Sequence, residues 1–318
     1  MNVITMKILS SCLAATLLVV IPVAAHAKIE RVVEKTFTVQ TGGVLKIDTA
    51  GGDIRVTPGA DDQVHVIARQ MIRTNSQTDA DILLEKLELK IEQSGNDVSA
   101  SAKYEQRPIG FHFGSWPPVA VSFEVKVPSS YGTVLRTSGG DIVIGNLTGK
   151  MNAHTSGGDI TLGKIDGEIS VHTSGGNIRL QESTGLAHLE TSGGDIKVGK
   201  VFGPAELSTS GGNIRIETVE GRLNAHTSGG DVTAGIKGAL VDDCSLGTSG
   251  GNVRVTVDAG VGFDLDASTS GGDVEAEGLT IKIQRGGIGK SRLSGEVNGG
   301  GPRLKLHTSG GDIDILTR

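Results

Sequence analysis

The sequence predicts an all-β fold, a single-stranded β-solenoid (β-helix) with coils of about 18 residues. Three observations lead to this prediction: a hexapeptide that recurs at a fixed interval, apolar columns in register with it, and a composition rich in Gly and poor in aromatic residues. The N-terminal part lacks the regular repeat. We expect it to form a β-rich capping module that contains one short helix.

The hexapeptide has the form Thr-Ser-Gly-Gly-Asp/Asn-Ile/Val. It begins at Thr137, Thr155, Thr173, Thr191, Thr209, Thr227, Thr248, Thr269 and Thr308. The first five intervals are 18 residues, and the later ones are 21, 21 and 39. Such a period is too short for a helical pair or a propeller blade and fits one coil of short strands. A single earlier relative, Thr49–Ile54, stands apart.

Apolar residues occupy equivalent positions in every coil. One column runs from Ile142 to Ile313, and the next begins two residues later at Ile144. Two further columns lie two and four residues before each repeat Thr. Period-two alternation places these columns inside the coil and their neighbours outside. We therefore expect a thin aliphatic core, with the Gly-Gly pairs supplying positive φ angles at sharp corners.

The chain divides into three parts in this prediction. Residues 1–27 have the features of a secretory signal peptide: Lys7, an apolar run, and the small-residue site Ala25-His26-Ala27. Residues 28–136 form the capping module, with a helix over Asp79–Leu89 that has Thr78 or Asp79 as its N-cap. Residues 137–318 form the solenoid repeats with a C-terminal closing segment around Gly278–Gly301.

The repeats and their flanks resemble the bacterial "putative-adhesin" domain family, a family of unknown function with Gly-Gly-Asp-Ile repeats. The matching features are Phe37–Gly52, the Val121–Pro128 strand and the closing Leu293–Ile315 stretch. The resemblance covers nearly the whole chain after the signal peptide. It implies an exported β-helical protein with an adhesive role, and it supplies no catalytic residues.

The Asp/Asn position of the hexapeptide is the first candidate site. From Asp159 to Asp273 the residues alternate between Asp and Asn, and each Asn coil has an Arg two positions later. This ladder comprises Asp159, Asn177, Arg179, Asp195, Asn213, Arg215, Asp231, Asn252, Arg254 and Asp273. Amide–carboxylate and Arg–Asp pairs between coils would make it a structural device that sets register. The alternative is calcium, although the Gly-Gly-x-Gly-x-Asp pattern of calcium-binding β-rolls is absent.

Histidine and cysteine are weaker candidates. His154, His172, His226 and His307 directly precede a repeat Thr, and His188 lies nearby. A solvated histidine row is favoured over a metal site, because zinc needs three or four ligands and Glu190 is the only obvious third. Cys244 lies in an inward column between Leu223 and Leu265, which indicates a buried structural thiol.

Aromatic residues gather in one segment of the capping module. Phe111, Phe113 and Trp116 lie in a loop that contains prolines. They form either a plug over the end of the core or a binding patch for a partner or glycan.

The resulting functional hypothesis is an exported, non-enzymatic solenoid, adhesin-like or a cell-envelope scaffold, that is periplasmic, surface-located or secreted. The alternatives are a polysaccharide-acting β-helix enzyme, an envelope-stress sensor component and, last, an ice-binding protein with Thr rows. We expect no catalytic residues, no cofactor, no metal and no membrane span after signal cleavage. The partner is an unidentified envelope or surface protein or glycan. The net charge of −6 and the absence of a basic cluster argue against nucleic acid.

Overall fold

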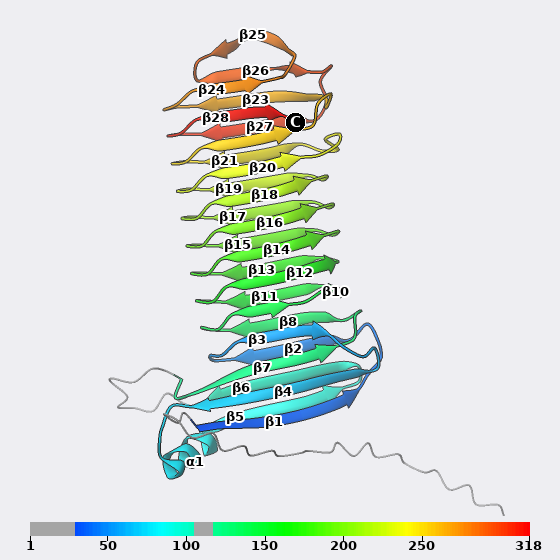
Figure 1. The fold of residues 1–318 in the computed structure, drawn as a ribbon, viewed down its shortest axis with the longest axis vertical. Helices are drawn as coiled ribbons and strands as arrows, with labels where there is room; N and C mark the ends of the chain where they lie inside the picture. Colours follow the sequence, from blue (N-terminus) through cyan, green and yellow to red (C-terminus); the bar gives the residue numbers. More distant parts are fainter. Residues whose placement is uncertain (1–28, 105–116) are drawn as a thin grey trace, which may run out of the picture.

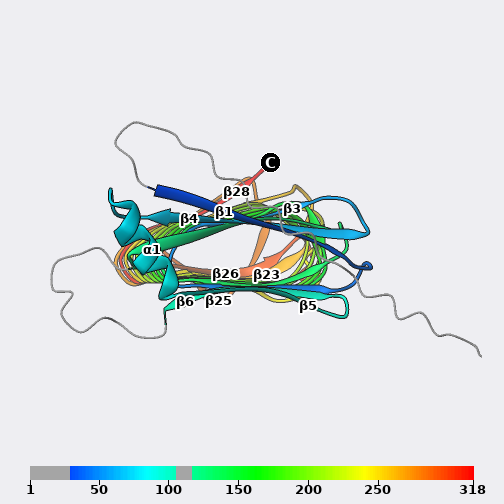
Figure 2. The same ribbon diagram turned by 90° about the horizontal axis from the view of Figure 1, so that it is seen from below.

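Two long β-sheets face each other and form a tall stack of flattened coils (Figure 1). The structure is a computed structural model that describes residues 29–104 and 117–318, without the side chains of residues 284–286. Viewed along the stack, the sheets form two layers with the core between them (Figure 2). The predicted all-β solenoid is confirmed, and each coil contributes one strand to each sheet.

We name the sheets A and B. In sheet A the strands lie in the order β1 (Ile29–Thr38), β4 (Gln63–Ile72), β7 (Val119–Val127), β3 (Ile54–Pro58), β9 (Ile142–Ile144), β12 (Ile160–Asp166), β14 (Ile178–Ser183), β16 (Ile196–Val201), β18 (Ile214–Val219), β20 (Val232–Ile236), β22 (Val253–Val257), β28 (Ile313–Thr317) and β24 (Val274–Glu277), with β10 (Leu147–Thr148) paired to β12.

In sheet B the order from the same end is β5 (Leu87–Ser94), β6 (Asp97–Tyr104), β2 (Val44–Thr49), β8 (Gly132–Thr137), β11 (Met151–Thr155), β13 (Ile169–Thr173), β15 (Ala187–Thr191), β17 (Ala205–Thr209), β19 (Leu223–Thr227), β21 (Cys244–Thr248), β27 (Arg303–Thr308), β23 (Phe263–Thr269), β26 (Arg292–Val297) and β25 (Ile281–Gly289).

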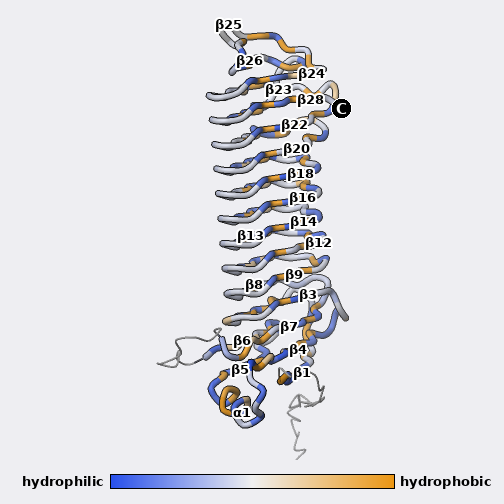
Figure 3. Tube along the Cα trace, turned by 60° about the vertical axis from the view of Figure 1, so that its left-hand side comes forward, coloured by the Kyte–Doolittle hydropathy of each residue, from blue (hydrophilic) through white to orange (hydrophobic). Residues whose placement is uncertain are grey.

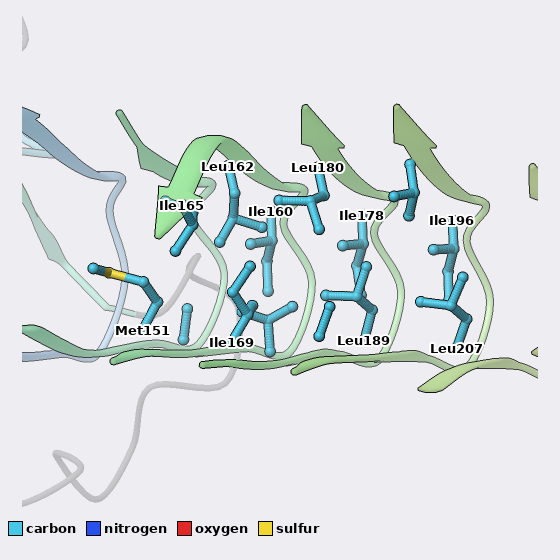
Figure 4. Packing of buried hydrophobic residues seen from close by; sticks show 14 of the residues in the cluster. Met151, Ile160, Leu162, Ile165, Ile169, Ile178, Leu180, Leu189, Ile196 and Leu207 are labelled. Atoms are coloured by element: carbon cyan, nitrogen blue, oxygen red, sulfur yellow. The ribbon is translucent and has the colours of Figure 1, made fainter. Parts of the chain in front are cut away.

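The predicted inward columns form the core. In the coil of β12 and β13, Ile160 and Ile169 are fully buried and meet across the space between the sheets (Figure 4). Burial of each such side chain contributes about 1.5–3 kcal/mol. The alternation of apolar and polar residues along the strands recurs at the same place from coil to coil, as the hydropathy colours in Figure 3 show. A further buried column, absent from the sequence prediction, comprises Leu147, Ile165, Ser183, Val201, Val219 and Ile236.

The Gly-Gly corners need glycine for a reason other than the predicted positive φ. Among the corner pairs of the described chain, only Gly52 has a φ in the left-handed region, +122°. A Cβ on the second glycine of each pair would instead overlap the coil below. At Gly194 it would lie 2.0 Å from the carbonyl oxygen of Gly176. The prediction of positive φ was therefore wrong, because close approach between stacked backbones is the constraint.

The earlier relative Thr49–Ile54 forms a full coil with β2 and β3. This coil stacks directly below the first regular repeat: β2 pairs in parallel with β8, and β3 with β9. Both sheets run without interruption across the expected boundary between residues 136 and 137. Antiparallel strands occur below this coil, where β4 and β1 extend sheet A and β5 extends sheet B.

The single helix of the described chain, α1 (Gln77–Glu85), lies beside the lower end of the core (Figure 2). Its N-cap is Ser76, whose hydroxyl accepts a hydrogen bond from the backbone N–H of Asp79. The sequence prediction, which named Thr78 or Asp79 as the N-cap, was therefore wrong by two or three residues. Ala80 is buried, and Leu83 and Leu84 pack against the core.

The coils do not stack in chain order at the upper end. The chain runs from β21–β22 to β23–β24, forms the β25–β26 hairpin at the end of sheet B, and then returns. Its last strands, β27 and β28, enter between the two preceding coils, as the red strands between yellow and orange ones in Figure 1 show. The Thr269 coil therefore contacts the Thr308 coil rather than the Thr248 coil. In the part of the chain that the structure describes, no helix has the length and apolar character for a membrane crossing.

The close approach of the corners predicts an asymmetry between the two glycines of one pair. Gly194→Ala should lower the free energy of unfolding by about 1–3 kcal/mol, because the new methyl group must displace a backbone carbonyl. Gly193→Ala is the matched control: its Cβ would lie 3.6 Å from the nearest atom, and we expect a change within about 0.5 kcal/mol. Urea denaturation of both variants measures the difference, and equal destabilisation would contradict the steric explanation.

Candidate functional site

The Asp/Asn positions of the corners form one continuous hydrogen-bonded column. In each coil the side-chain Oδ1 accepts a hydrogen bond from the backbone N–H of the Asp or Asn in the next coil, at 2.7–2.9 Å. In stacking order the residues are Asp53, Asp141, Asp159, Asn177, Asp195, Asn213, Asp231, Asn252, Asp312 and Asp273. The column supplies acceptors for corner amides that the sheets leave without a partner.

The order and the arginine contacts of this column differ from the sequence prediction. Asn252 and Asp273 are not neighbours, because Asp312 of the returning C-terminal segment lies between them. Arg254 binds Asp314 of β28, with a closest N···O distance of 2.6 Å, rather than a corner carboxylate. The repeated columns cannot reveal this exchange of neighbours, since every coil offers the same pattern.

The other two arginines behave differently from each other. Arg179 contacts Asp159 at 2.7 Å, whereas Arg215 forms no ion pair with any described residue. The side-chain amides of Asn177 and Asn213 donate to the carboxylates of Asp159 and Asp195 in the coils below. Alternation of Asp and Asn therefore separates the carboxylates by amides.

Asp159 shows how the column holds a negative charge. Burial by itself would raise the pKa of Asp159, but hydrogen bonds from Arg179 and from Asn177 outweigh it and lower the pKa below its ordinary value. The charged carboxylate therefore stabilises the fold above the ordinary carboxyl pKa of about 4. This contribution is lost as the pH falls through the lowered pKa of the folded state.

Among the described residues, no group of ligands supports the calcium alternative. Within residues 29–104 and 117–318, no three His, Cys, Asp or Glu side chains are grouped so that they could hold a metal ion. Along the column from Asp53 to Asp312, each Oδ1 already accepts a backbone hydrogen bond.

The repeat threonines form a second column, whose bonding the sequence did not reveal. Thr155 Oγ1 donates to the carbonyl oxygen of Gly140 in the coil below, at 2.9 Å, and accepts from the N–H of Gly158 at 3.3 Å. Equivalent bonds to the coil below occur at Thr137, Thr173, Thr191, Thr209, Thr227, Thr248, Thr308 and Thr269. All nine are buried, so they offer no ice-binding face. A signal for this column was present in the sequence: each repeat Thr lies on the same face of its strand as the inward aliphatic residues that precede it.

Histidines lie on the outer face of sheet B. His154 and His172 stack with ring centroids 5.1 Å apart and an interplanar angle of 6°. Further along the stack, Oε2 of Glu190 lies 3.5 Å from Nδ1 of His172, and Oε2 of Glu206 lies 3.4 Å from Nδ1 of His188. The outer face of sheet B is thus a polar surface on which histidines lie next to one another and next to carboxylates.

The pKa of His154 lies below its ordinary value. Burial is the largest cause, and the charges of His172 and Arg136 on the neighbouring strands add to it. Folding therefore shifts the equilibrium of His154 towards the neutral imidazole.

Cys244 is 2% exposed and lies in the inward column of sheet B. Its Sγ accepts a hydrogen bond from the N–H of Leu223 at 3.4 Å, and burial raises the pKa of the thiol. Its neighbour on the other side is Leu304 rather than the expected Leu265. The environment is that of a packed thiol, not an activated one.

The aromatic candidates Phe111, Phe113 and Trp116 lie outside the described residues. Two other aromatic residues of the capping module, Phe123 and Tyr131, are fully buried in the lower part of the stack.

A groove of about 650 Å³ on the outer face of sheet A was not predicted from the sequence. Its lining includes Gly163 and Gly199, where no side chain fills the surface. A Cβ at Gly163 would lie 2.4 Å from Asn146 Oδ1, and one at Gly199 would lie 2.4 Å from the carbonyl oxygen of Gln181. At Gly199 the backbone of the neighbouring coil therefore requires glycine, whereas at Gly163 the nearest atom belongs to a side chain. Both positions leave a hollow on the outer face of sheet A.

Basic side chains lie in and beside this groove. Arg179 and Lys197 line it, and Arg215 lines the neighbouring hollow; the three occupy directly paired positions on β14, β16 and β18. Like charges at such positions repel one another. The groove is also lined by Lys164, Lys200, Glu182 and Glu217. Two ion pairs form here: Nζ of Lys164 lies 3.4 Å from Oε2 of Glu182, and Nζ of Lys197 lies 3.9 Å from Oε1 of Glu217. Among the described residues, Lys200 and Arg215 have no ion-pair partner.

The corner column predicts two distinguishable effects at Asn213. Asn213→Asp keeps the Oδ1 acceptor but places three carboxylates in successive coils, so it should cost about 0.2–1 kcal/mol at low salt. That cost should largely disappear in about 1 M NaCl. Asn213→Ala removes the acceptor and should cost about 0.5–1.5 kcal/mol at any salt concentration. Denaturation at both salt concentrations tests this, and a salt-independent loss in Asn213→Asp would contradict it.

The lowered pKa of His154 predicts a pH dependence of stability. The unfolded chain binds a proton at His154 near pH 6.5, while the folded chain binds it only at lower pH. The free energy of unfolding should therefore decline as the pH falls from about 6.5 towards the lowered pKa. His154→Asn should flatten this part of the profile, and Arg136→Gln should raise the imidazole pKa in an NMR titration. An unchanged profile in His154→Asn would refute the assignment.

Comparison with known proteins places the chain in a family. The model of the Toastrack DUF4097 family matches residues 43–316, and among curated proteins none matches. Similar solved structures include a putative adhesin from Bacteroides fragilis NCTC 9343, with 13% identity, 90% of this chain and 97% of that chain covered, and a TM-score of 0.41.

Two others come from Parabacteroides distasonis ATCC 8503: a putative adhesin, with 12% identity, coverage of 90% and 97%, and a TM-score of 0.35, and a putative lipid binding protein, with 11% identity, coverage of 90% and 96%, and a TM-score of 0.37. At such low values these likenesses carry no argument about function. The family match extends over the N-terminal coil, all the repeats and nearly all of the returning segment. This chain belongs to the Toastrack DUF4097 family.

Proposed function

We propose that this protein is an exported, non-enzymatic, adhesin-like solenoid that presents repeated polar columns to an envelope or cell-surface component. The observation that carries the proposal is the strict register of outward side chains from coil to coil. The proposal itself rests on the geometry of the columns.

The register is fixed by three kinds of contact between coils. Parallel sheet pairing joins the strands, the repeat threonines bond across the buried side of the corner, and the Asp/Asn side chains bond across its exposed side. Each column therefore repeats at about 4.8 Å along the stack. A surface of this kind loses little conformational freedom when a long partner binds, since its spacing is already set.

We assign the basic row on sheet A to the partner. This row comprises Arg179, Lys197, Arg215 and the nearby Lys200. Lys200 and Arg215 have no ion-pair partner among the described residues, and Arg179 and Lys197 extend the row. Each exposed ion pair with a ligand is worth only about 0–1 kcal/mol. Several such contacts to one polymer add through multivalency. The fitting partner is therefore an extended acidic polymer, such as an anionic glycan of the envelope.

A binding experiment with charge-reversed variants tests this function. Lys200→Glu/Arg215→Glu should weaken binding of the purified chain to immobilised anionic polysaccharide by at least about ten-fold, because repeated contacts are lost together. The control Lys290→Glu/Lys305→Glu makes the same change in net charge away from the groove and should retain binding. Binding to a neutral polysaccharide should be absent in all variants.

Two results would overturn the proposal. One is equal binding by the two variants, which would exclude the groove as the binding surface. The other is hydrolysis of the polysaccharide by the purified chain, which would favour the enzyme alternative. Fractionation of cells with protease treatment of the intact surface tests the exported location, and a cytoplasmic chain would contradict it.

A further inference from the structure

The last residues of the chain occupy a slot between two coils that precede them in sequence. In sheet B, β27 pairs in parallel with β21 on one side and β23 on the other. In sheet A, β28 pairs in parallel with β22 and β24. Without residues 302–318, β24 would have no partner in its sheet. The segment is thus an inserted coil rather than a cap.

The inserted segment takes part in every column of the stack. Leu304, Leu306, Ile313 and Ile315 are fully buried in the core. Thr308 Oγ1 donates to the carbonyl oxygen of Gly251, and Thr269 Oγ1 donates to that of Gly311, each at 2.7 Å. The Asp312 side chain and N–H bridge the corner column.

The slot accepts only a segment with glycine at the corner. A Cβ at Gly311 would lie 2.3 Å from the carbonyl oxygen of Gly251, and a Cβ at Gly272 would lie 2.3 Å from that of Gly311. The occupant must also place a hydroxyl at the Thr308 position and alternating aliphatic residues on both sides. Residues 302–318 meet all these requirements, and so does the same segment of another copy of this chain.

The connection to the segment has the form of a hinge. Asn298, Gly299, Gly300 and Gly301 all have φ in the left-handed region, from 49° to 154°. Glycines there can also take extended conformations at little cost. A change of conformation at residues 298–301 can therefore carry residues 302–318 out of the slot.

We propose that the slot between the Thr248 coil and the Thr269 coil is a binding site for residues 302–318 of a second copy of this chain. The exchanged form keeps all the contacts of the slot and changes only the hinge. The monomer is favoured at low concentration, because the tethered segment has a high effective concentration. Refolding at high protein concentration favours exchange. The proposal is independent of the acidic partner on sheet A.

Cysteine trapping between two copies tests the exchange. Ser245 and Lys305 are exposed, directly paired residues on β21 and β27. Full chains with Cys12→Ser and Cys244→Ala carry either Ser245→Cys or Lys305→Cys, with different affinity tags. Paired positions on adjacent strands have the spacing that a disulfide requires. After refolding together at high concentration and mild oxidation, a heterodimeric disulfide reports a segment of one copy in the slot of the other.

The matched control uses Asn152→Cys and Ser170→Cys, which are paired in the same outward column on β11 and β13. These strands lie inside the repeat array and outside residues 302–318, so the proposed exchange does not move them. We expect at least about ten-fold more heterodimer from the Ser245/Lys305 mixture than from the control mixture.

A single chain with both Ser245→Cys and Lys305→Cys, oxidised as a monomer beforehand, should no longer exchange with an untagged partner. Equal yields from the two mixtures, or no heterodimer from either, would overturn the proposal. Circular dichroism of each single-cysteine chain verifies that it folds, so failure to fold is separated from failure to exchange.

Discussion

The close approach of successive corners is the constraint on which the rest of this structure depends. The second glycine of each pair lies so near the glycine carbonyl of the coil below that even a methyl group has no room. This approach brings the repeat threonine within reach of the same carbonyl and the corner amide within reach of the Asp or Asn below. Close packing, a buried hydroxyl column and an exposed polar column are therefore consequences of one geometry.

The coil and its core follow from sequence periodicity, because a residue that must face inward in every coil leaves a visible column. The physical role of the glycines does not follow as directly. Gly194 is required by a neighbouring backbone, whereas sequence rules associate glycine pairs with positive φ. The stacking order was also beyond prediction: Ile313 and Val274 satisfy the same column, so only three-dimensional packing reveals that β28 lies between β22 and β24.

The candidate site was predictable in its residues but only partly in its bonds. The alternation of Asp and Asn identified the corner column. Its main role, in which each Oδ1 accepts a hydrogen bond from a backbone N–H of the next coil, could not be predicted, because no sequence pattern shows which backbone amides lack a partner. The groove on sheet A was missed, although Gly145, Gly163, Gly199 and Gly235 recur at multiples of 18 residues. Glycines on an outward column mark close backbone contact and also leave the surface hollow above them.

Amide hydrogen exchange at the corner tests the central claim most directly. In the intact chain the N–H of Asp231, an exposed residue, donates to Asn213 Oδ1 of the coil below, and it should exchange slowly with solvent deuterium. In Asn213→Ala this amide should lose its protection, while the amides of Asp195 and Asn177, whose acceptors are unchanged, keep theirs. Rapid exchange at Asp231 in the unaltered chain would contradict the account, because the column would then not hold the coils together.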